Sequence, residues 1–421
     1  MLRQTLHGLA ARASPRRPLS TERLLSMSSM KFPSVIQKFV LLLPAVFLMA
    51  TAAFSADQPK GIVTYEKGNN GTITILVDGD FFSQYRPIPD PAPEEGPVAG
   101  SYDSHEILGT PIVWPICSAA GTLMTRGFPM DERNYPEAAD DPIFRNILAN
   151  SRLGSLTANK DHIHHRSLWF NHGDVNGIDF WGPDRGQIIQ QGIFSITEET
   201  HSVAIKVFTA WIPQPNETPL CVDIRTITFG VLPQRPEIRY IDYDVKLSAY
   251  IDEITLADSK EGTFGYRTAG TMDVDAVKRS EKWGGHILNS DRYEDEAAWG
   301  KRASWVDYYG PVPKRLSETE LTQVDPENPE SLPLTSAGVD IMNHPAGFRY
   351  PSWYHVRTYG LFAVNPFGIK EFEPESKLDG TVVLKKGESL SFYYRVLIHD
   401  NPLSYEELQT LFDEYKSVSK N

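Results

Sequence analysis

The sequence has little of several features that would assign a function directly. Its 421 residues include only two cysteines, Cys117 and Cys221, and no CxxC pair. In an oxidising compartment these two could pair, but two buried free thiols fit equally well. No P-loop, no dinucleotide-binding glycine motif and no nucleophile elbow is present. Basic charge is also scarce, because 41 Lys and Arg residues stand against 54 Asp and Glu residues, a net charge of −13. A chain this acidic is a poor partner for nucleic acid, and we expect none.

Long apolar runs are rare too, and the one present lies near the N-terminus. Residues 39–54 (FVLLLPAVFLMATAAF) follow basic residues and precede small ones, which is typical of a secretory signal. A membrane span needs about 20 apolar residues, so this run is short for an anchor, although an uncleaved anchor is the alternative. We expect a start at Met30, cleavage near Ser55 and Ala56, and a periplasmic or secreted protein without later membrane contact.

The remainder reads as one domain, residues 57–421, preceded by an N-terminal extension and signal over residues 1–56. From residue 187 onward, segments with alternating apolar side chains recur at a spacing of roughly 8–12 residues. Residues 201–212 (HSVAIKVFTAWI) show this alternation clearly. Such strands predict an all-β fold with large antiparallel sheets, and the lack of alternating strand and helix patterns excludes a doubly wound fold.

Three segments depart from this pattern. Residues 86–100 hold five prolines and read as a loop insertion, because proline removes donors from a strand ladder. Residues 131–160 are polar, and we expect them to be irregular. Residues 404–417 predict a helix, since Ser404 and Glu407 fit a capping box and apolar residues recur at helical spacing.

The densest chemistry lies in residues 161–181 (DHIHHRSLWFNHGDVNGIDFW). Four of the chain's 11 histidines lie here, namely His162, His164, His165 and His172. Imidazole is well suited to proton transfer near neutral pH and is a common metal ligand. Read as a strand, period-two alternation puts His162, His164 and Arg166 on one face. His165 then points to the opposite face. The following NHGDVNG reads as a turn, so the stretch predicts the floor and lip of a pocket. A basic surface strand with a tight turn is the simpler alternative.

Four further blocks stand out beside this stretch. They are MTRGFPM (124–130), KEGTFGYR (260–267), WGKRASWVDYYG (299–310) and SWYHVRTYGLFAVNPFG (352–368). Together these blocks resemble a bacterial family labelled "methane oxygenase PmoA" or a domain of unknown function, over most of residues 109–400. The strand pattern and the closing hairpin into YRVLIH are similar to the galactose-mutarotase-like superfamily. The resemblance therefore implies a large antiparallel β-supersandwich with a carbohydrate ligand.

Mutarotase-like sites use a histidine and a carboxylate as acid and base, so the resemblance implies a site of that kind. The predicted catalytic residues are His164, His165, His172 and Glu261. The predicted substrate-binding residues are Arg126, Arg166, Trp169, Asp174, Asp179, Arg267, Trp353, His355 and Arg357. Arg126, Arg166 and Arg267 offer a planar fork of donors to an anionic group, and the tryptophans offer rings for stacking on a sugar.

Several of these residues have simpler structural alternatives. Asp174 could merely stabilise the turn through a hydrogen bond from its side chain. His355 could be a satisfied core histidine in a strand. Arg357 could pair with an acid on a neighbouring strand.

A metal site is the remaining alternative for the histidines. His162 and His164 could supply two ligands, with a third from His172 or a carboxylate, for a divalent or copper ion. The leading interpretation requires no cofactor. It is an exported carbohydrate-active enzyme of lyase, hydrolase or epimerase type. The alternatives are a non-catalytic carbohydrate-binding protein and a metal-dependent oxygenase, as the family label suggests.

Overall fold

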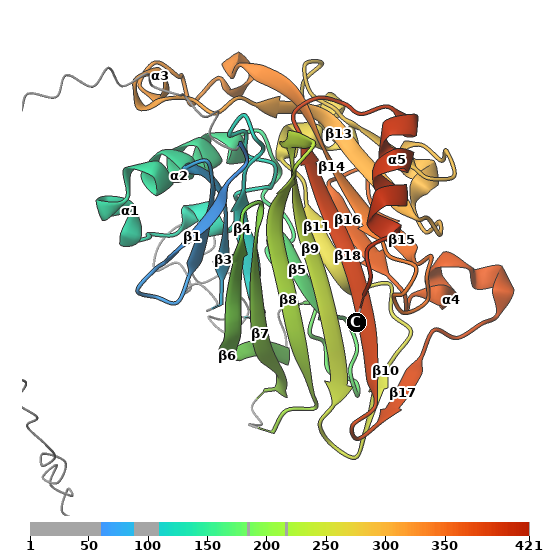
Figure 1. Ribbon diagram of the computed structural model, residues 1–421. Coiled ribbons are helices and arrows are strands. Elements are labelled where there is room, and N and C mark those ends of the chain that lie inside the picture. Colours follow the sequence, from blue (N-terminus) through green and yellow to red (C-terminus); the bar gives the residue numbers. More distant parts are fainter. Residues whose placement is uncertain (1–59, 88–108, 183–185, 215–217, 421) are drawn as a thin grey trace, which may run out of the picture. The chain divides into compact units, whose positions relative to one another are not determined.

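The computed structural model describes residues 60–87, 109–182, 186–214 and 218–420 (Figure 1). All of them belong to one compact unit, Asp57–Asn421. The predicted signal, its cleavage site, the predicted start at Met30 and most of the Pro-rich segment lie outside the described residues. Among the helices described, none has the length and apolar character needed to cross a bilayer.

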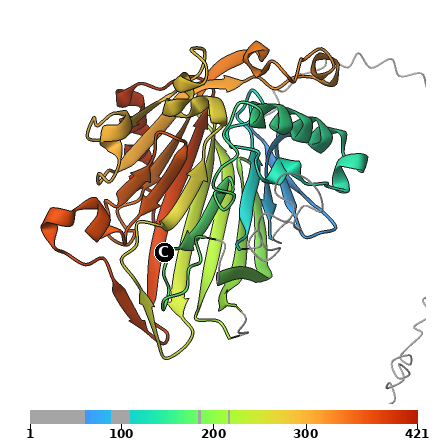
Figure 2. The ribbon, with the colours of Figure 1, turned by 180° about the vertical axis from the view of Figure 1, so that it is seen from behind.

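Two eight-stranded antiparallel sheets form the body of this unit (Figures 1 and 2). In spatial order, the first sheet comprises β1 (Val63–Lys67), β2 (Ile73–Val77), β3 (Asp80–Arg86), β4 (Ile112–Ile116), β5 (Leu168–His172), β11 (Gly262–Arg267), β16 (Leu361–Asn365) and β15 (Trp353–Val356). The second comprises β12 (His286–Asn289), β13 (Trp305–Pro313), β14 (Leu334–Asn343), β18 (Ser389–His399), β9 (Arg235–Ala249), β8 (Cys221–Leu232), β7 (Ser202–Pro213) and β6 (Gly186–Glu199). A small third sheet pairs β10 (Glu253–Leu256) with β17 (Val382–Lys385). The predicted all-β class with large antiparallel sheets is confirmed.

The main core lies between the two large sheets, because each strand turns one row of apolar side chains inward. In β7, Val203, Ile205 and Val207 are fully buried in this core, whereas Ala204 and Lys206 are not. Burying each such side chain stabilises the fold by about 1.5–3 kcal/mol. The alternation in the sequence therefore places one face of each strand against the opposite sheet.

The first sheet buries part of its other face as well. Directly opposite residues on neighbouring antiparallel strands point to the same side, so Trp169, Gly265, Ala363 and His355 form one outer row across β5, β11, β16 and β15. Trp169 and Ala363 belong to a second apolar cluster on this face. A Cβ added at Gly265 would lie 2.4 Å from the Trp169 ring. Only glycine therefore lets the indole lie across β11.

The predicted C-terminal helix is confirmed as α5 (Tyr405–Lys416). Ser404 and Glu407 form the expected reciprocal capping box. Its buried side chains are Leu408, Leu411, Phe412 and Tyr415. They pack with Trp305 and other residues on the outer face of the second sheet, where Figure 1 shows the helix in red. The other helices are α1 (Glu137–Asp140), α2 (Pro142–Ser155), α3 (Glu318–Leu321) and α4 (Ile369–Phe372).

The expectation that residues 131–160 are irregular is wrong, because α2 occupies the second half of this segment. Asp141 caps the helix by accepting hydrogen bonds from the backbone N–H groups of Ile143 and Phe144, at 2.9 and 3.0 Å. The buried apolar side chains are Phe144, Ile147 and Leu148. This narrow apolar stripe covers the outer cluster of the first sheet.

Residues 161–167, called the histidine loop from here on, do not form the predicted strand. Strand β5 begins only at Leu168, and the backbone at His162 and Ser167 has positive φ values of 46° and 60°. Left-handed backbone at two positions breaks the period-two alternation of a strand. The prediction that His162, His164 and Arg166 share a strand face is therefore wrong.

Both cysteines are buried and free. Burial raises the pKa of Cys117 to about 11, so its thiol stays protonated and unreactive at neutral pH. Of the two readings of Cys117 and Cys221, the pair of buried thiols is the one confirmed.

Candidate functional site

The candidate site lies on the outer face of the first sheet, around the outer row that ends at His355. Three segments meet there: the histidine loop, Lys260 and Glu261 just before β11, and the turn of residues 357–360 that joins β15 to β16. Backbone hydrogen bonds close this turn, with Gly360 donating to the carbonyl of Arg357 at 3.0 Å.

Four aromatic rings form a column through the site. Tyr359, His162, His165 and Trp169 stack in this order, with centroid separations of 5.2, 4.9 and 5.6 Å and interplanar angles of 8°, 2° and 14°. The column runs from His162, whose side chain is 42% exposed, down to the buried Trp169. His164 stands edge-on against His165 at 4.4 Å. The column fixes the three histidine rings close together.

Two buried arginines anchor the histidine loop from below. Arg267 donates to Asp161 Oδ1 at 2.6 Å, and Arg126 donates to the same oxygen at 3.1 Å. Arg126 also donates to Asp273 Oδ2 at 2.7 Å. Burial would raise the pKa of Asp161, but the hydrogen bond from His162 and the two arginine charges lower it to about 2. Arg126 and Arg267, predicted to bind substrate, are thus buried and already paired with acids.

His165 is held in its neutral form. Arg267 Nη1 donates to His165 Nδ1 at 3.0 Å, and Trp181 Nε1 lies 3.3 Å from His165 Nε2. Guanidinium and indole nitrogens only donate, so both sides of the ring face donors and disfavour the imidazolium. Burial and the neighbouring cationic groups lower the pKa of His165 well below its usual range. With 3% exposure, His165 acts as a positioning residue.

His164 is the predicted catalytic histidine that solvent can reach beside a carboxylate. It is half-buried, and no hydrogen bond joins its ring to any part of the chain that the structure describes. Burial and the charge of His162 lower its pKa to about 4, against the opposing effect of Glu261. Glu261 has a side chain that is 33% exposed and forms an ion pair with Lys260. The pair His164 and Glu261 therefore offers a neutral base next to an accessible carboxylate.

His355 lies beneath this pair. Its Nδ1–H donates to the backbone carbonyl of Lys260 at 2.9 Å, which leaves Nε2 as the unprotonated nitrogen. Burial lowers the pKa of His355 to about 4, and the charge of Glu261 opposes this shift. His355 packs against Trp299 and Phe372 at 3% exposure. The side chain is a well-packed histidine, as the simpler alternative proposed, and it also adjoins the site.

Arg357 projects from the turn between two aromatic rings. Its guanidinium carbon lies 5.6 Å from the Trp299 ring and 5.6 Å from the Tyr359 ring. The side chain is only half-buried. Among the described residues no acid pairs with it, so the alternative of an ion pair on a neighbouring strand is not observed.

His172 is not brought to the other three histidines. It follows Leu168 and Phe170 on the inner face of β5, opposite to Trp169. Its Nε2–H donates to the backbone carbonyl of Ala257 at 2.9 Å, and its ring packs on Phe367 at 4.6 Å. Burial lowers its pKa to about 4. A sheet therefore separates His172 from the site.

Asp174 and Asp179 support the turn after β5. Asp174 Oδ1 accepts a hydrogen bond from the Gly177 N–H at 2.7 Å, in a turn at Asn176–Gly177. The turn is shorter than the predicted NHGDVNG, because Asn171 and His172 still belong to β5. Asp179 Oδ1 accepts one from the Trp181 N–H at 2.8 Å. The structural alternative for Asp174 is thus observed.

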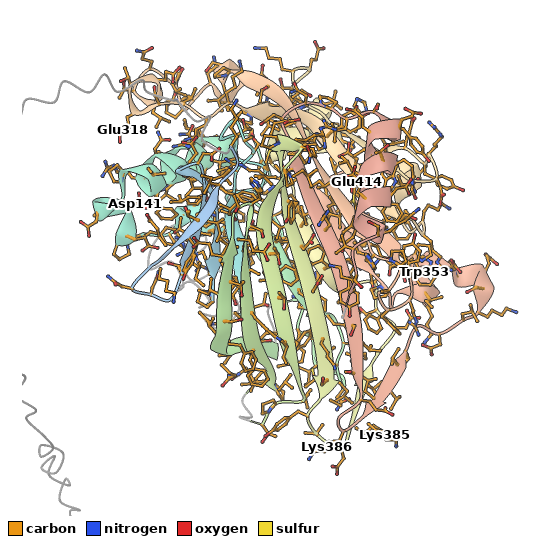
Figure 3. All side chains as sticks on the ribbon, in the orientation of Figure 1. Asp141, Glu318, Trp353, Lys385, Lys386 and Glu414 are labelled. Atoms are coloured by element: carbon orange, nitrogen blue, oxygen red, sulfur yellow. The ribbon has the colours of Figure 1, made fainter. Side chains whose placement is uncertain are left out.

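Arg166 and Trp353 lie to either side of the site. Arg166 is buried and donates to the carbonyl of Thr110 at 3.2 Å. Burial lowers its pKa to about 10. Trp353 donates to Glu373 at 2.8 Å and packs beside α4, where Figure 3 labels it.

Three residues of the site were missed in the sequence. Tyr359, Trp299 and Lys260 all belong to the blocks that carry the family resemblance. Aromatic and basic residues are common on any surface, so their type alone gave no signal. Their position within those blocks was the one available clue.

The geometry around the histidines bears on the predicted metal pair. In the described ranges, no three side chains of His, Cys, Asp or Glu are gathered so that they could hold an ion. His162 and His164 have ring centroids 5.8 Å apart. An ion at this pair would need its other ligands from outside the described part of the chain.

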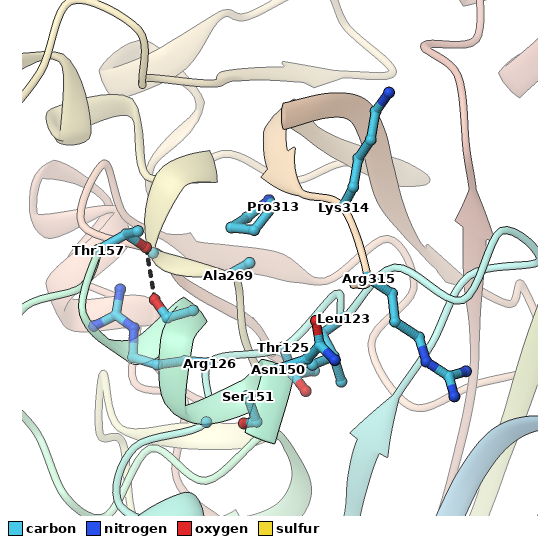
Figure 4. Close-up of a pocket in the computed structure, with 13 residues that line it drawn as sticks. Leu123, Thr125, Arg126, Asn150, Ser151, Thr157, Ala269, Pro313, Lys314 and Arg315 are labelled. Carbon is cyan, nitrogen blue, oxygen red and sulfur yellow. Dashed lines mark hydrogen bonds between the residues drawn. The ribbon is translucent and has the colours of Figure 1, made fainter. Parts of the chain in front are cut away.

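A cavity behind Arg126 does not extend the site. It is lined by Thr125, Asn150 and Ser151 on one side and by Lys314 and Arg315 on the other (Figure 4). Its volume is about 20 Å³, which holds roughly one water molecule. A sugar ring does not fit there.

A sequence model of the family of unknown function DUF6807 matches residues 72–413, which include every residue of the site. The chain belongs to this family. Comparison with curated proteins gives no match.

Two solved structures are similar to this DUF6807 member. One is a protein described as a kojibiose phosphorylase from the human microbiome, with 10% identity and a TM-score of 0.25 over 60% of this chain. The other is the heparan sulfate lyase HepC from Pedobacter heparinus, with 9% identity and a TM-score of 0.28 over 82% of this chain. The chain spans 26% and 36% of the lengths of these two proteins.

Proposed function

We propose that this protein is an exported carbohydrate-active enzyme that acts by histidine–carboxylate acid–base chemistry on the outer face of its first sheet. The observation that carries the proposal is the half-exposed ring of His164, which stands 4.4 Å from the ring of His165 and forms no hydrogen bond within the described chain, with the charge of Glu261 acting on it. We place the sandwich with the galactose-mutarotase-like superfamily and the reaction among lyases, hydrolases and epimerases.

The roles follow from the charge states. With a pKa of about 4, His164 is neutral near neutral pH and has a lone pair ready to accept a proton from a substrate hydroxyl or carbon. The imidazolium that forms gains stabilisation from the negative charge of Glu261 beside it. His165, fixed by Arg267, holds the neighbouring ring in place. Trp299, which is half-buried beside Arg357, supplies an aromatic surface for a sugar.

The first test is a glycan conversion screen with the purified protein and two matched variants. His164→Gln should lower turnover about 100-fold, the usual loss on removal of a general base. His286→Gln changes an exposed histidine on β12, in the other sheet, and should leave turnover unchanged. Equal turnover in wild type and His164→Gln would reject the assignment.

A non-catalytic carbohydrate-binding protein is the second candidate. The burial and fixed protonation of His165 favour it, because such a residue holds shape and moves no proton. Sugar binding without conversion, with equal affinity in wild type and His164→Gln, would support this interpretation.

A metal-dependent oxygenase is the third candidate, and the clustering of three histidine rings favours it. Elemental analysis of protein purified without chelator or added metal, alongside His164→Ala, tests it. A stoichiometric divalent or copper ion that the variant loses would replace acid–base chemistry as the leading proposal.

Export is tested separately from chemistry. Fractionation with N-terminal sequencing should find the protein in the periplasm or medium, beginning near Ala56. A cytoplasmic protein that retains residues 39–54 would contradict export.

A further inference from the structure

The charges around the site leave one cation without an acid. Asp161 faces Arg126 and Arg267, while Asp273 faces Arg126 and Arg279. Glu261 pairs with Lys260. Within the described residues, Arg357 has no such partner. The site is therefore locally cationic, although the chain carries a net charge of −13.

The packing of Arg357 holds the guanidinium without using its donors. Trp299 and Tyr359 contact it through their ring faces, each at 5.6 Å. An aromatic face attracts the guanidinium cation but accepts no hydrogen bond from the N–H groups in the guanidinium plane. These donors of Arg357 therefore stay available for an oxyanion. A half-buried position strengthens such a contact, because water screens it less than at an open surface.

The turn that carries Arg357 is itself fixed. Its Gly360 has φ +91°, and a Cβ there would lie 2.0 Å from Asp273 Oδ1. The backbone N–H of Arg357 donates to the carbonyl of Leu361 at 2.7 Å. The turn therefore sits directly on the buried charge network, which sets Arg357 beside Tyr359 before any ligand arrives.

We propose that the ligand of this site is an acidic sugar, and that Arg357 binds its carboxylate or sulfate group. This inference rests on the proposed function, because it names the substrate class for the face that carries His164. An acidic group on Arg357 would hold the adjoining sugar ring beside the histidine loop, because Tyr359 links Arg357 to the exposed ring of His162. Arg357 is therefore a substrate-binding residue. Neutral sugars bind weakly, because they have no acidic group for its guanidinium.

The experiment measures the affinity of the full protein for three kinds of oligosaccharide: uronate-containing, sulfated and neutral ones of matched length. Calorimetric titration at low and high salt is compared for wild type, Arg357→Gln, Arg357→Lys and Arg292→Gln. Arg292 is the matched control, since it is an exposed arginine stacked on Tyr405 beside α5. Thermal unfolding of each variant verifies that it is folded.

We expect acidic sugars to bind at least about 10-fold more tightly than neutral ones, and this preference to shrink in high salt. Arg357→Gln should weaken acidic ligands by about 30-fold and leave neutral ones unchanged. Arg357→Lys should recover part of the loss, because it restores charge without the planar fork. Arg292→Gln should behave as wild type. Comparing uronates with sulfated sugars then tells which oxyanion the site takes.

Neutral sugars that bind as tightly as acidic ones, with affinity unaffected in Arg357→Gln and Arg357→Lys, would overturn the inference and leave the proposed function standing. Failure of every sugar to bind would overturn the proposed function itself, and the inference with it.

Discussion

Each large sheet carries a histidine beside a carboxylate, and the two pairs behave in opposite ways. On the first sheet, His164 and Glu261 are partly exposed, and burial with nearby cationic groups lowers the pKa of His164 to about 4. On the second sheet, His399 Nε2 lies 3.1 Å from Asp307 Oδ1, and both side chains are at most 2% exposed. Burial alone would lower the pKa of His399, but the charge and hydrogen bond of Asp307 raise it.

The difference shows what separates a reactive pair from a structural one. His399 donates through both ring nitrogens, to Asp307 and to the Asn401 carbonyl at 2.6 Å. A buried imidazolium whose two N–H groups both donate to the protein cannot transfer a proton to a substrate. His164 has no such partner in the described chain, so its proton affinity remains available for chemistry. Residue types alone do not distinguish the two pairs.

The buried pair also has a third member. Asp340 lies directly opposite Asp307 across β13 and β14 and is fully buried. Burial and the charge of Asp307 raise the pKa of Asp340 well above its usual range. The folded protein therefore favours the protonated form of Asp340.

The largest expected effect comes from breaking the buried pair. Asp307→Ala leaves His399 without its counter-charge and should lower the free energy of unfolding by about 3–5 kcal/mol. Urea denaturation measures this loss. The control is Glu253→Ala, which removes the exposed partner of Lys385 and should cost less than about 1 kcal/mol. Equal losses in the two variants would mean that burial does not set the strength of the His399 pair.

The second prediction concerns how the exposed pair responds to pH. If neutral His164 is the base, turnover should rise with pH through about 4 and be level above it, because the imidazole is already deprotonated there. Glu261 favours the imidazolium, so Glu261→Gln should shift this acidic limb to lower pH. The pH–rate profiles of wild type and variant measure both effects. An acidic limb near the ordinary histidine pKa in both proteins would show that His164 is not the base.

The third prediction uses the raised pKa of Asp340. In the unfolded chain this carboxyl ionises above about pH 4, whereas the folded protein must keep it protonated. Folding therefore loses stability as pH rises from that point. Asp340→Asn removes the cost and should raise the free energy of unfolding by about 1–2 kcal/mol at neutral pH, with little gain near pH 4. Urea denaturation at the two pH values measures it, and a destabilised variant at neutral pH would contradict the protonated state.

The smallest expected effect is at the outer end of the ring column. His162→Ala removes one exposed ring from between Tyr359 and His165 and should cost about 0.5–1 kcal/mol of stability. Thermal unfolding measures this cost. A loss comparable to that of Asp307→Ala would show that the ring column contributes as much to the stability of the fold as the buried pair does.

Much of the fold was predictable because it depends on local patterns. Alternation in residues 201–212 and the capping box at Ser404 specified a strand and a helix that are both present. Helix α2 was missed although Asp141 and Pro142 are typical helix-start residues, because its apolar stripe is narrow and its other faces are polar. Sequence patterns failed to predict the element in which only a few apolar side chains pack into the core, namely helix α2.

The sequence predicted several residues of the site but not how they are arranged in space. Glu261 and Arg357 were both chosen from the sequence, and both lie at the site. His172 was chosen on the same grounds, yet it differs from Trp169 by an odd number of positions in one strand and so faces the opposite side. The strand also starts later than alternation suggested, since the backbone at Ser167 is left-handed. Such backbone states depend on the buried Asp161 network, which spans segments far apart in the sequence.

The packing of Trp169, at the buried end of the ring column, limits which mutations this protein can tolerate. Trp169 rests on a position, Gly265, that contributes no side chain at all. A single added methyl group there would lift the indole and, through His165 and His162, disturb the exposed end of the ring column. A mutation at a position without a side chain can therefore alter the candidate site while all of its histidines, acids and arginines stay unchanged.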